Sequence, residues 1–183
     1  MSSQKYAPGM YFYGKVLEEG NSVAAGADEG SRLIRESAGK NGPAIYEIAE
    51  ARLEGNRLDK DPEKGMDLMR DAARHGSRSA QQFLGQAYEK GAPTGADAEK
   101  SRHYFRICAK GGDSLCQFRL GKSLLEESGR SERDYVQAIA WLHVAANQGM
   151  AGAKELLSHE DAHLTPSQIA DARKLMMQRA PPK

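Results

Sequence analysis

A short phrase recurs about every 36 residues, and this period constrains the fold of the chain more than any other feature of the sequence. Small residues open the copies at spacings of 36, 36 and 37 positions: Ala44, Ala80, Cys116 and Ala153. A fixed period of this length indicates stacked supersecondary units, because each unit buries its apolar face only against its neighbours. The period therefore predicts a repeat protein, a class that offers extended surfaces for partners and no ready-made catalytic pocket.

Each unit has the pattern of two helices joined by short turns. Apolar residues of the second copy fall on one helical face at i, i+4, i+7 and i+8: Ala80, Leu84, Ala87 and Tyr88. A turn-rich break follows, and Asp97 is suited to cap a second helix that ends at Gly111-Gly112. The equivalent caps are Asp61 and Asp134, and Pro62 suits the first helical turn after Asp61. We expect core packing for the aromatic residues at helical spacing: Tyr88, Tyr104, Phe105 and Trp141.

Glycine recurs inside the predicted first helices, at Gly14, Gly85 and Gly121. A glycine within a helix costs about 1 kcal/mol relative to alanine. Its recurrence therefore predicts that the two helices of each pair approach closely at this position.

The sequence predicts an all-α, right-handed solenoid of antiparallel helix pairs that forms one domain over residues 1–183. The expected divisions are a degenerate repeat at about 8–41, repeats at 42–76, 77–112 and 113–149, a half repeat at 150–163, and a capping helix at 165–180. Thr165 and Gln168 form the capping-box pattern that begins this last helix. An open end of a solenoid needs such a cover with a polar outer face.

The repeated phrase resembles the Sel1-like repeat, a relative of the tetratricopeptide repeat. The residues that carry the resemblance are Ala80, Leu84, Gly85, Tyr88, Gly91 and Asp97, with the Ala-Ala-x-x-Gly ending at Ala72-Ala73-x-x-Gly76 and Ala145-Ala146-x-x-Gly149. The resemblance spans about residues 8–180, with departures at Arg52, Leu124 and Glu127. It implies a module that binds other proteins, and it supplies no catalytic residues.

We expect a partner segment to bind in a concave groove lined by the first helix of each unit. The predicted contacts point away from the helix partner: Tyr11, Lys15, Tyr46, Glu50, Gln82, Gln86, Glu89, Phe118 and Lys122. The position two residues before the Leu-Gly pair is aromatic in three of four units, which suits the anchoring of a peptide. The alternative is that these aromatic residues pack between neighbouring units.

Cys108 and Cys116 are the only two cysteines, and they occupy positions where the other units have alanine. These positions lie on either side of a tight turn, so the side chains could face each other as a disulfide requires. Some members of the Sel1-like family that the phrase resembles have a Cys-x7-Cys bridge, and its cysteines lie one residue later relative to the Leu-Gly pair. The alternative is two buried small hydrophobic residues, since a disulfide needs an oxidising compartment.

The net charge of +1, from 26 basic and 25 acidic residues, gives no general attraction to nucleic acid or to an anionic membrane. No apolar run approaches the roughly 18 residues of a membrane span, and the first residues contain no signal-peptide h-region. We expect no membrane insertion, no nucleic-acid partner and a monomer. The resemblance favours a periplasmic or cell-envelope location, with the cytoplasm as the alternative.

One motif is typical of a metalloenzyme. His159, Glu160 and His163 fit H-E-x-x-H, which can bind zinc when it lies on one helix. Here Pro166 follows closely, so we expect the motif to straddle the end of a helix and to be a polar linker. The sequence therefore predicts no metal site, no cofactor and no enzymatic activity.

The predicted function is that of a protein-binding scaffold or adaptor, in a bacterial envelope or secretion-related system. The alternative is a dedicated inhibitor or immunity protein that blocks one toxin or enzyme. The two alternatives differ in stoichiometry, since an inhibitor forms a tight one-to-one complex.

Overall fold

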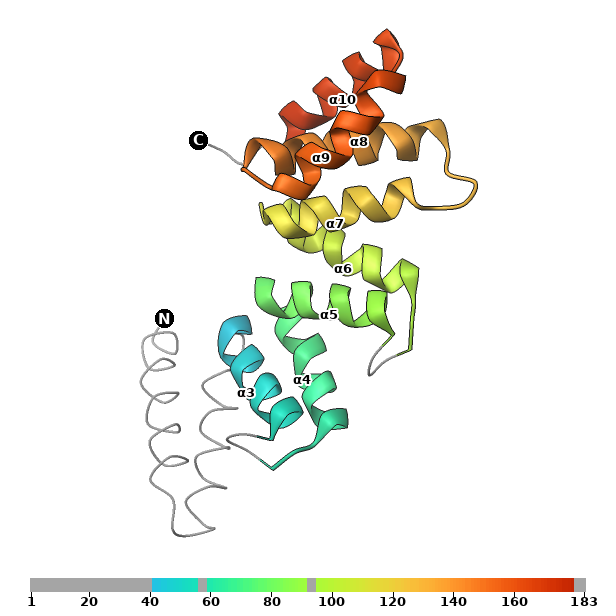
Figure 1. Cartoon of the computed structure of the whole chain (residues 1–183). Coiled ribbons are helices and arrows are strands. Elements are labelled where there is room, and N and C mark those ends of the chain that lie inside the picture. The colour runs from blue at the N-terminus through green and yellow to red at the C-terminus, as the bar shows by residue number, and fades with distance from the viewer. Residues whose placement is uncertain (1–40, 56–58, 92–94, 180–183) are drawn as a thin grey trace, which may run out of the picture. The chain divides into compact units, whose positions relative to one another are not determined.

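The computed structural model describes residues 41–55, 59–91 and 95–179, and all their regular structure is helical (Figure 1). The elements are α3 (Gly42–Glu54), α4 (Pro62–Arg74), α5 (Arg78–Lys90), α6 (Ala98–Lys110), α7 (Ser114–Leu125), α8 (Glu132–Asn147), α9 (Ala151–Glu160), the short 3-10 helix η1 (Asp161–His163) and α10 (Pro166–Arg179). The prediction of an all-α repeat fold is confirmed for these residues. The predicted first repeat, at about 8–41, lies almost entirely outside them.

The chain divides into two compact units, one ending at Gln81 and the other beginning at Gln82. In the first unit α3 packs against α4 through the buried side chains of Ile45, Ile48, Met66 and Met69. The backbone N–H of Asp61 donates to the carbonyl of Arg52 at 2.9 Å and closes the turn between the two helices.

The second unit packs its helices in chain order, with α6 against α7, α7 against α8 and α8 against α9. Phe105, Leu120, Ile139 and Leu142 are fully buried in its core. Helix α10 returns to cover α8 through the buried side chain of Ala172. It has the predicted capping box, since the Gln168 N–H donates to Thr165 Oγ1 at 3.3 Å and the Thr165 N–H donates to Gln168 Oε1 at 2.9 Å.

The helix starts follow the predicted caps in two of three repeats. Asp61 and Asp97 each accept a hydrogen bond from the backbone N–H three residues later. The prediction that Asp134 caps α8 is wrong, because that helix begins earlier, with Ser131 as its N-cap. Asp134 is instead the third helical residue, and its carboxylate accepts from the backbone N–H of Ser131 in a capping box.

Glycine stands inside the helices where two of them meet closely. A Cβ atom on Gly85 would lie 2.6 Å from the Phe105 ring, and one on Gly121 would lie 2.8 Å from Leu142 Cγ. The first unit, which has Ala49 at this position, has its glycine on the opposite helix, at Gly65. A Cβ on Gly65 would lie 3.2 Å from the carbonyl oxygen of Ala49. The predicted close approach of the paired helices is thus confirmed at Gly85 and Gly121, while Gly14 lies outside the described residues.

Candidate partner-binding surface

The predicted binding residues fall on the first helices of the repeats. Tyr46 and Glu50 lie on α3 of the first unit. The second unit contributes residues of α5 and α7: Gln82, Gln86, Glu89, Phe118 and Lys122. Tyr11 and Lys15 lie outside the described residues. No helix in the described part of the chain has both the length and the hydrophobicity to cross a membrane.

Tyr46 and Glu50 form a hydrogen-bonded pair one helical turn apart. The Tyr46 hydroxyl donates to Glu50 Oε1 at 2.7 Å, and both residues are half-buried. Burial, the hydrogen bond to Glu50 and the negative charges of Glu50 and Glu54 together raise the pKa of Tyr46 to about 12. The pair therefore presents a neutral phenol held against a carboxylate, so a partner that binds Tyr46 must fit beside this acid.

Helices α5 and α7 are joined across neighbouring repeats by an ion pair. Arg119 Nη1 lies 2.8 Å from Glu89 Oε2, and both side chains are about one-third exposed. The Nε of Arg119 is buried and has no hydrogen-bond partner among the described residues. Sequence reasoning missed Arg119, although its position next to the predicted contact Phe118 places it on the same helix turn. Along their helices, Glu89 lies one turn after Gln86 and Arg119 lies one turn before Lys122.

Phe118 is half-buried and packs against the core of the second unit. A Cβ on Gly152 of α9 would lie 3.1 Å from Phe118 Cζ, so the ring closely approaches the first helix of the following repeat. One side of the ring is therefore used in packing between repeats, the arrangement that the alternative interpretation predicted. A role for the remaining surface of Phe118 in binding stays a prediction.

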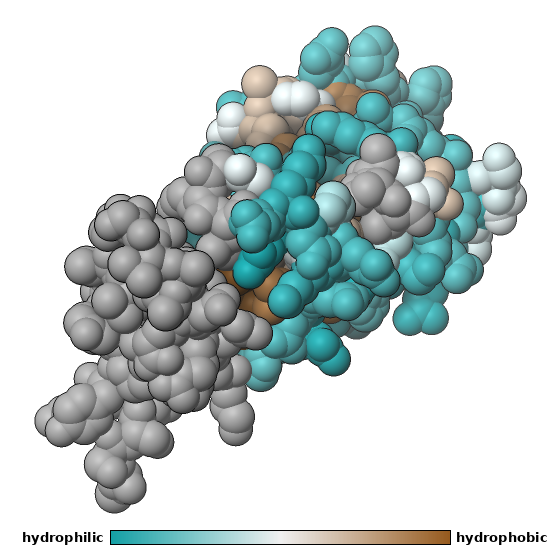
Figure 2. Space-filling model, turned by 90° about the horizontal axis from the view of Figure 1, so that it is seen from below, coloured by the Kyte–Doolittle hydropathy of each residue, from teal (hydrophilic) through white to brown (hydrophobic). Residues whose placement is uncertain are grey.

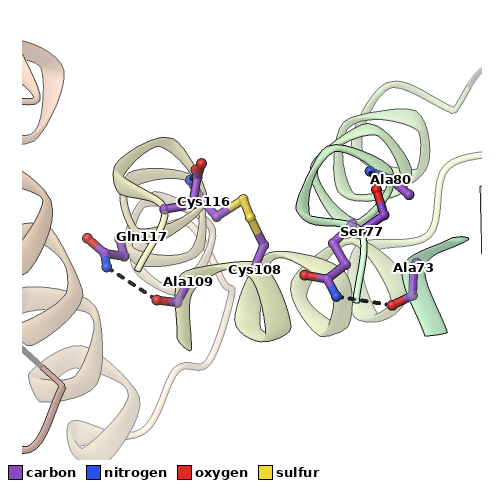
Figure 3. Close-up of a disulfide and its surroundings, with 9 residues drawn as sticks. Ala73, Ser77, Ala80, Cys108, Ala109, Cys116 and Gln117 are labelled. Carbon is purple, nitrogen blue, oxygen red and sulfur yellow. Dashed lines mark hydrogen bonds between the residues drawn. A yellow bond between two sulfur atoms is a disulfide. The ribbon is translucent and has the colours of Figure 1, made fainter. Parts of the chain in front are cut away.

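The two cysteines form a disulfide that joins α6 to α7 (Figure 3). Their sulfur atoms lie 2.15 Å apart, their Cα atoms lie 5.8 Å apart, and both side chains are fully buried. The carboxylate of Asp113 caps α7 by accepting from the Cys116 N–H at 2.9 Å. Within the described residues, Cys108, Asp113 and Cys116 also bring three potential metal-ligand atoms close together, but the disulfide occupies both sulfurs.

Two buried glutamines, the residues after Ala80 and Cys116, each bond to the end of the preceding helix. Gln117 Nε2 donates to the Ala109 carbonyl at 3.2 Å (Figure 3). Gln81 Nε2 donates to the Ala73 carbonyl at 3.1 Å. Gln148 Nε2 in turn donates to Gln117 Oε1 at 2.8 Å. The Ala73 and Ala109 carbonyls also accept from the backbone N–H of the glycine three residues later, so each glutamine adds a second hydrogen bond at a helix end.

The residues of the H-E-x-x-H motif lie on two different helices. His159 lies near the end of α9, and His163 belongs to η1. The carboxylate of Glu160 accepts a hydrogen bond from the Tyr135 hydroxyl at 3.0 Å. The predicted break within the motif is therefore confirmed, and Glu160 contributes to the contact between α8 and α9.

The comparisons with known proteins point to one repeat family. Residues 42–77, 78–113 and 114–150 each match the Sel1 repeat. A Sel1 repeat protein from Oxalobacter formigenes has a similar structure, with a TM-score of 0.63 and 27% identity over 69% of this chain and 95% of that protein. No match was found among curated proteins.

A second solved structure shows a likeness of fold alone. It is c5321, a protective antigen of uropathogenic Escherichia coli with an SLR fold, at a TM-score of 0.50 and 24% identity. The aligned region covers 96% of this chain but only 46% of that protein.

Proposed function

The chain belongs to the Sel1 repeat family, and on that basis we propose that it is a non-catalytic adaptor that holds a segment of another protein along the first helices of its repeats. Sel1 repeats mediate interactions between proteins, so the general function of this chain is to bind other proteins. The observation that carries the finer proposal is the set of half-buried residues on α5 and α7, which includes Gln82, Gln86 and Lys122.

Two features of this surface support a peptide-like partner. The half-buried Gln86 amide offers a donor and an acceptor to a backbone laid across the helices, and the Lys122 ammonium, 3.6 Å from Glu126 Oε1, offers further donors. The Glu89–Arg119 pair holds an acid and a base at fixed positions, which favours one register of a bound segment over another. Among the coloured residues, the face seen in Figure 2 is mainly hydrophilic.

We further propose a periplasmic or cell-envelope location in a bacterium. The disulfide between Cys108 and Cys116 supports this, because disulfides persist in oxidising compartments and are rare in the cytosol. Cell fractionation combined with alkylation before and after reduction tests the location. Protein recovered from the cytosol with two free thiols would overturn it.

The adaptor proposal is tested by capture of partners from the source cell with the tagged protein. The test variant is Gln82→Ala/Gln86→Ala/Lys122→Ala on the first helices. The matched control is Glu99→Ala/Arg106→Ala/Lys110→Ala on the exposed side of α6. Circular dichroism melting verifies that both variants fold, and we expect only the test variant to lose its partners.

The outcomes separate an adaptor from an inhibitor. Several partners, or one bound through an extended segment, support the adaptor. One toxin or enzyme that binds one-to-one and loses activity in the complex favours the inhibitor instead. A partner retained by the test variant and lost by the α6 variant would show that the binding surface does not lie on the first helices.

A further inference from the structure

A small pocket lies beside the contact between α8 and the last helix, α10, away from the first-helix surface described above. Its volume is about 280 Å³. Apolar side chains line most of it: Ile139, Leu164, Ile169, Ala172 and Met176. This volume is below the roughly 300–1,000 Å³ of sites that enclose a whole drug-sized ligand. The pocket is therefore large enough for one terminal residue of a peptide, with its side chain and its carboxylate.

Three charged or titratable residues line the same pocket: His143, Asp161 and Arg173. Asp161 Oδ1 lies 3.4 Å from His143 Nε2, a contact that becomes an ion pair when the imidazole is protonated. Arg173 is exposed, and it has no carboxylate within ion-pair distance in the described part of the chain. The guanidinium of Arg173 therefore remains available to an anion.

Arg173 immediately follows the buried Ala172 and lies one helical turn from both Ile169 and Met176. A ligand that uses both features needs an apolar group and an anionic group close together. The C-terminal residue of a protein has this combination, because its side chain and its free carboxylate are attached to the same Cα atom. Arginine recognises carboxylates with two parallel N–H donors.

We propose that this pocket binds the C-terminal residue of a partner protein, with an apolar side chain in the pocket and the terminal carboxylate on Arg173. The site is separate from the first-helix surface and does not depend on it. A negative result here leaves the adaptor proposal standing, and loss of the first-helix surface leaves this site testable.

The test uses backbone amide chemical-shift titration with an acetylated tetrapeptide, Gly-Ser-Gly-Leu, that has a free carboxylate. We expect saturable shifts that concentrate on the lining residues of α8, η1 and α10. A peptide that ends in serine should bind at least tenfold more weakly, because it buries no large apolar side chain. The amidated leucine peptide should bind roughly three- to fivefold more weakly, as expected for loss of one exposed ion pair.

A matched pair of variants tests the role of Arg173. Arg173→Gln should weaken binding of the free-carboxylate peptide by about three- to fivefold and leave binding of the amidated peptide unchanged. Lys174→Gln removes the same charge from the next residue, which lines a different cavity, and should change binding by less than twofold. Arg173 and Lys174 are both exposed, so neither change should unfold α10.

Several results would overturn the proposal. Shifts outside the pocket, or equal weakening by Arg173→Gln and Lys174→Gln, would show only general electrostatic attraction. Equal affinity of the free and amidated peptides would remove the role of the carboxylate. A second probe, 4-methylpentanoate, distinguishes the source of the carboxylate, since the peptide should bind more tightly through contacts of its preceding residues. Equal or tighter binding of this acid would assign the pocket to a free organic acid instead.

Discussion

Gly85 makes contact between α5 and α6 possible, because the Phe105 ring occupies the space where any other residue would place its Cβ. The close approach also lets Ser101 Oγ donate to the Gly85 carbonyl at 2.9 Å. We expect Gly85→Ala to destabilise the fold by up to roughly 2 kcal/mol, since overpacking costs about 1–3 kcal/mol and the gain in helix propensity returns about 1 kcal/mol.

Urea denaturation measures this effect. The control is Ser79→Ala, an exposed position on the same helix, which should stay within about 0.5 kcal/mol of wild type. A stabilised Gly85→Ala protein would mean that the Phe105 ring moves aside without cost.

Tyr46 is expected to make stability fall in alkaline solution. Its pKa is raised to about 12 in the folded protein, against about 10 for an unfolded chain. Between these pH values the folded state retains a proton that the unfolded state has released, so stability is lost as pH rises from about 10 toward 12. Tyr46→Phe should reduce this loss, as measured by denaturation at a series of pH values.

Glu50→Gln provides the comparison for the tyrosine. It removes the negative charge beside the Tyr46 hydroxyl but leaves the burial, which is the larger cause of the raised pKa. Absorbance titration of the tyrosinate should therefore give a pKa for Tyr46 that is lower than in wild type and still above 10. An unchanged pKa would show that Glu50 contributes nothing.

At the scale of the helical elements, the disulfide ties the end of α6 to the start of α7. A bridge with a sequence separation of 8 should contribute about 2–3 kcal/mol by restricting the unfolded chain. We expect Cys108→Ala/Cys116→Ala to lose this amount relative to the oxidised protein and to match reduced wild type closely. The other repeats have alanine at both positions, so the packing should tolerate the change: Ala72, Ala80, Ala145 and Ala153.

Denaturation of the oxidised, reduced and double-alanine proteins tests the size of this contribution. A double variant much less stable than reduced wild type would show that the sulfur atoms matter for packing as well as for the cross-link. Equal stability of the oxidised and reduced proteins would assign no stabilising role to the bridge.

The sequence predicted elements best where local chemistry alone determines them. Asp61, Asp97 and Thr165 cap helices because each offers a side-chain oxygen to N–H groups three residues later. The predicted N-cap of α8 was wrong because Ser131 and Asp134 both have a side-chain oxygen that could accept from the first N–H groups of a helix. In the structure Ser131 begins the helix, and Asp134 becomes the third helical residue of the capping box.

The glutamine contacts show what the repeat pattern left undetected. Gln81 and Gln117 follow the small residue that opens the phrase in two copies, a recurrence visible in the sequence. Glutamine is ordinarily a surface residue, so nothing in the pattern indicates that Gln117 is fully buried. Its role depends on the distance to the Ala109 carbonyl on another helix, which only the fold determines.

At the scale of the whole molecule, the period of 36 residues predicted the architecture but could not locate sites built from several helices. The pocket beside α10 joins residues from Ile139 to Met176, and no spacing rule relates them. The first-helix surface follows the period and could be predicted as a set. Its charge pairing could not, since Glu89 and Arg119 meet only through packing of α5 beside α7.

Repeat proteins are stabilised by contacts between neighbouring units, so the destabilising effect of a substitution at one end should decrease with distance along the chain. Ala172→Asp would place an unpaired carboxylate at a position that is only 2% exposed, where α10 packs on α8. We expect α10 to detach, so that amide hydrogen exchange becomes faster in α10 and α8 while α3 and α4 keep their protection. Ala170→Asp makes the same change at an exposed position of the same helix and should leave exchange unchanged. Equal loss of protection from α3 to α10 would show that the chain unfolds as one cooperative body, in which the last helix stabilises every repeat.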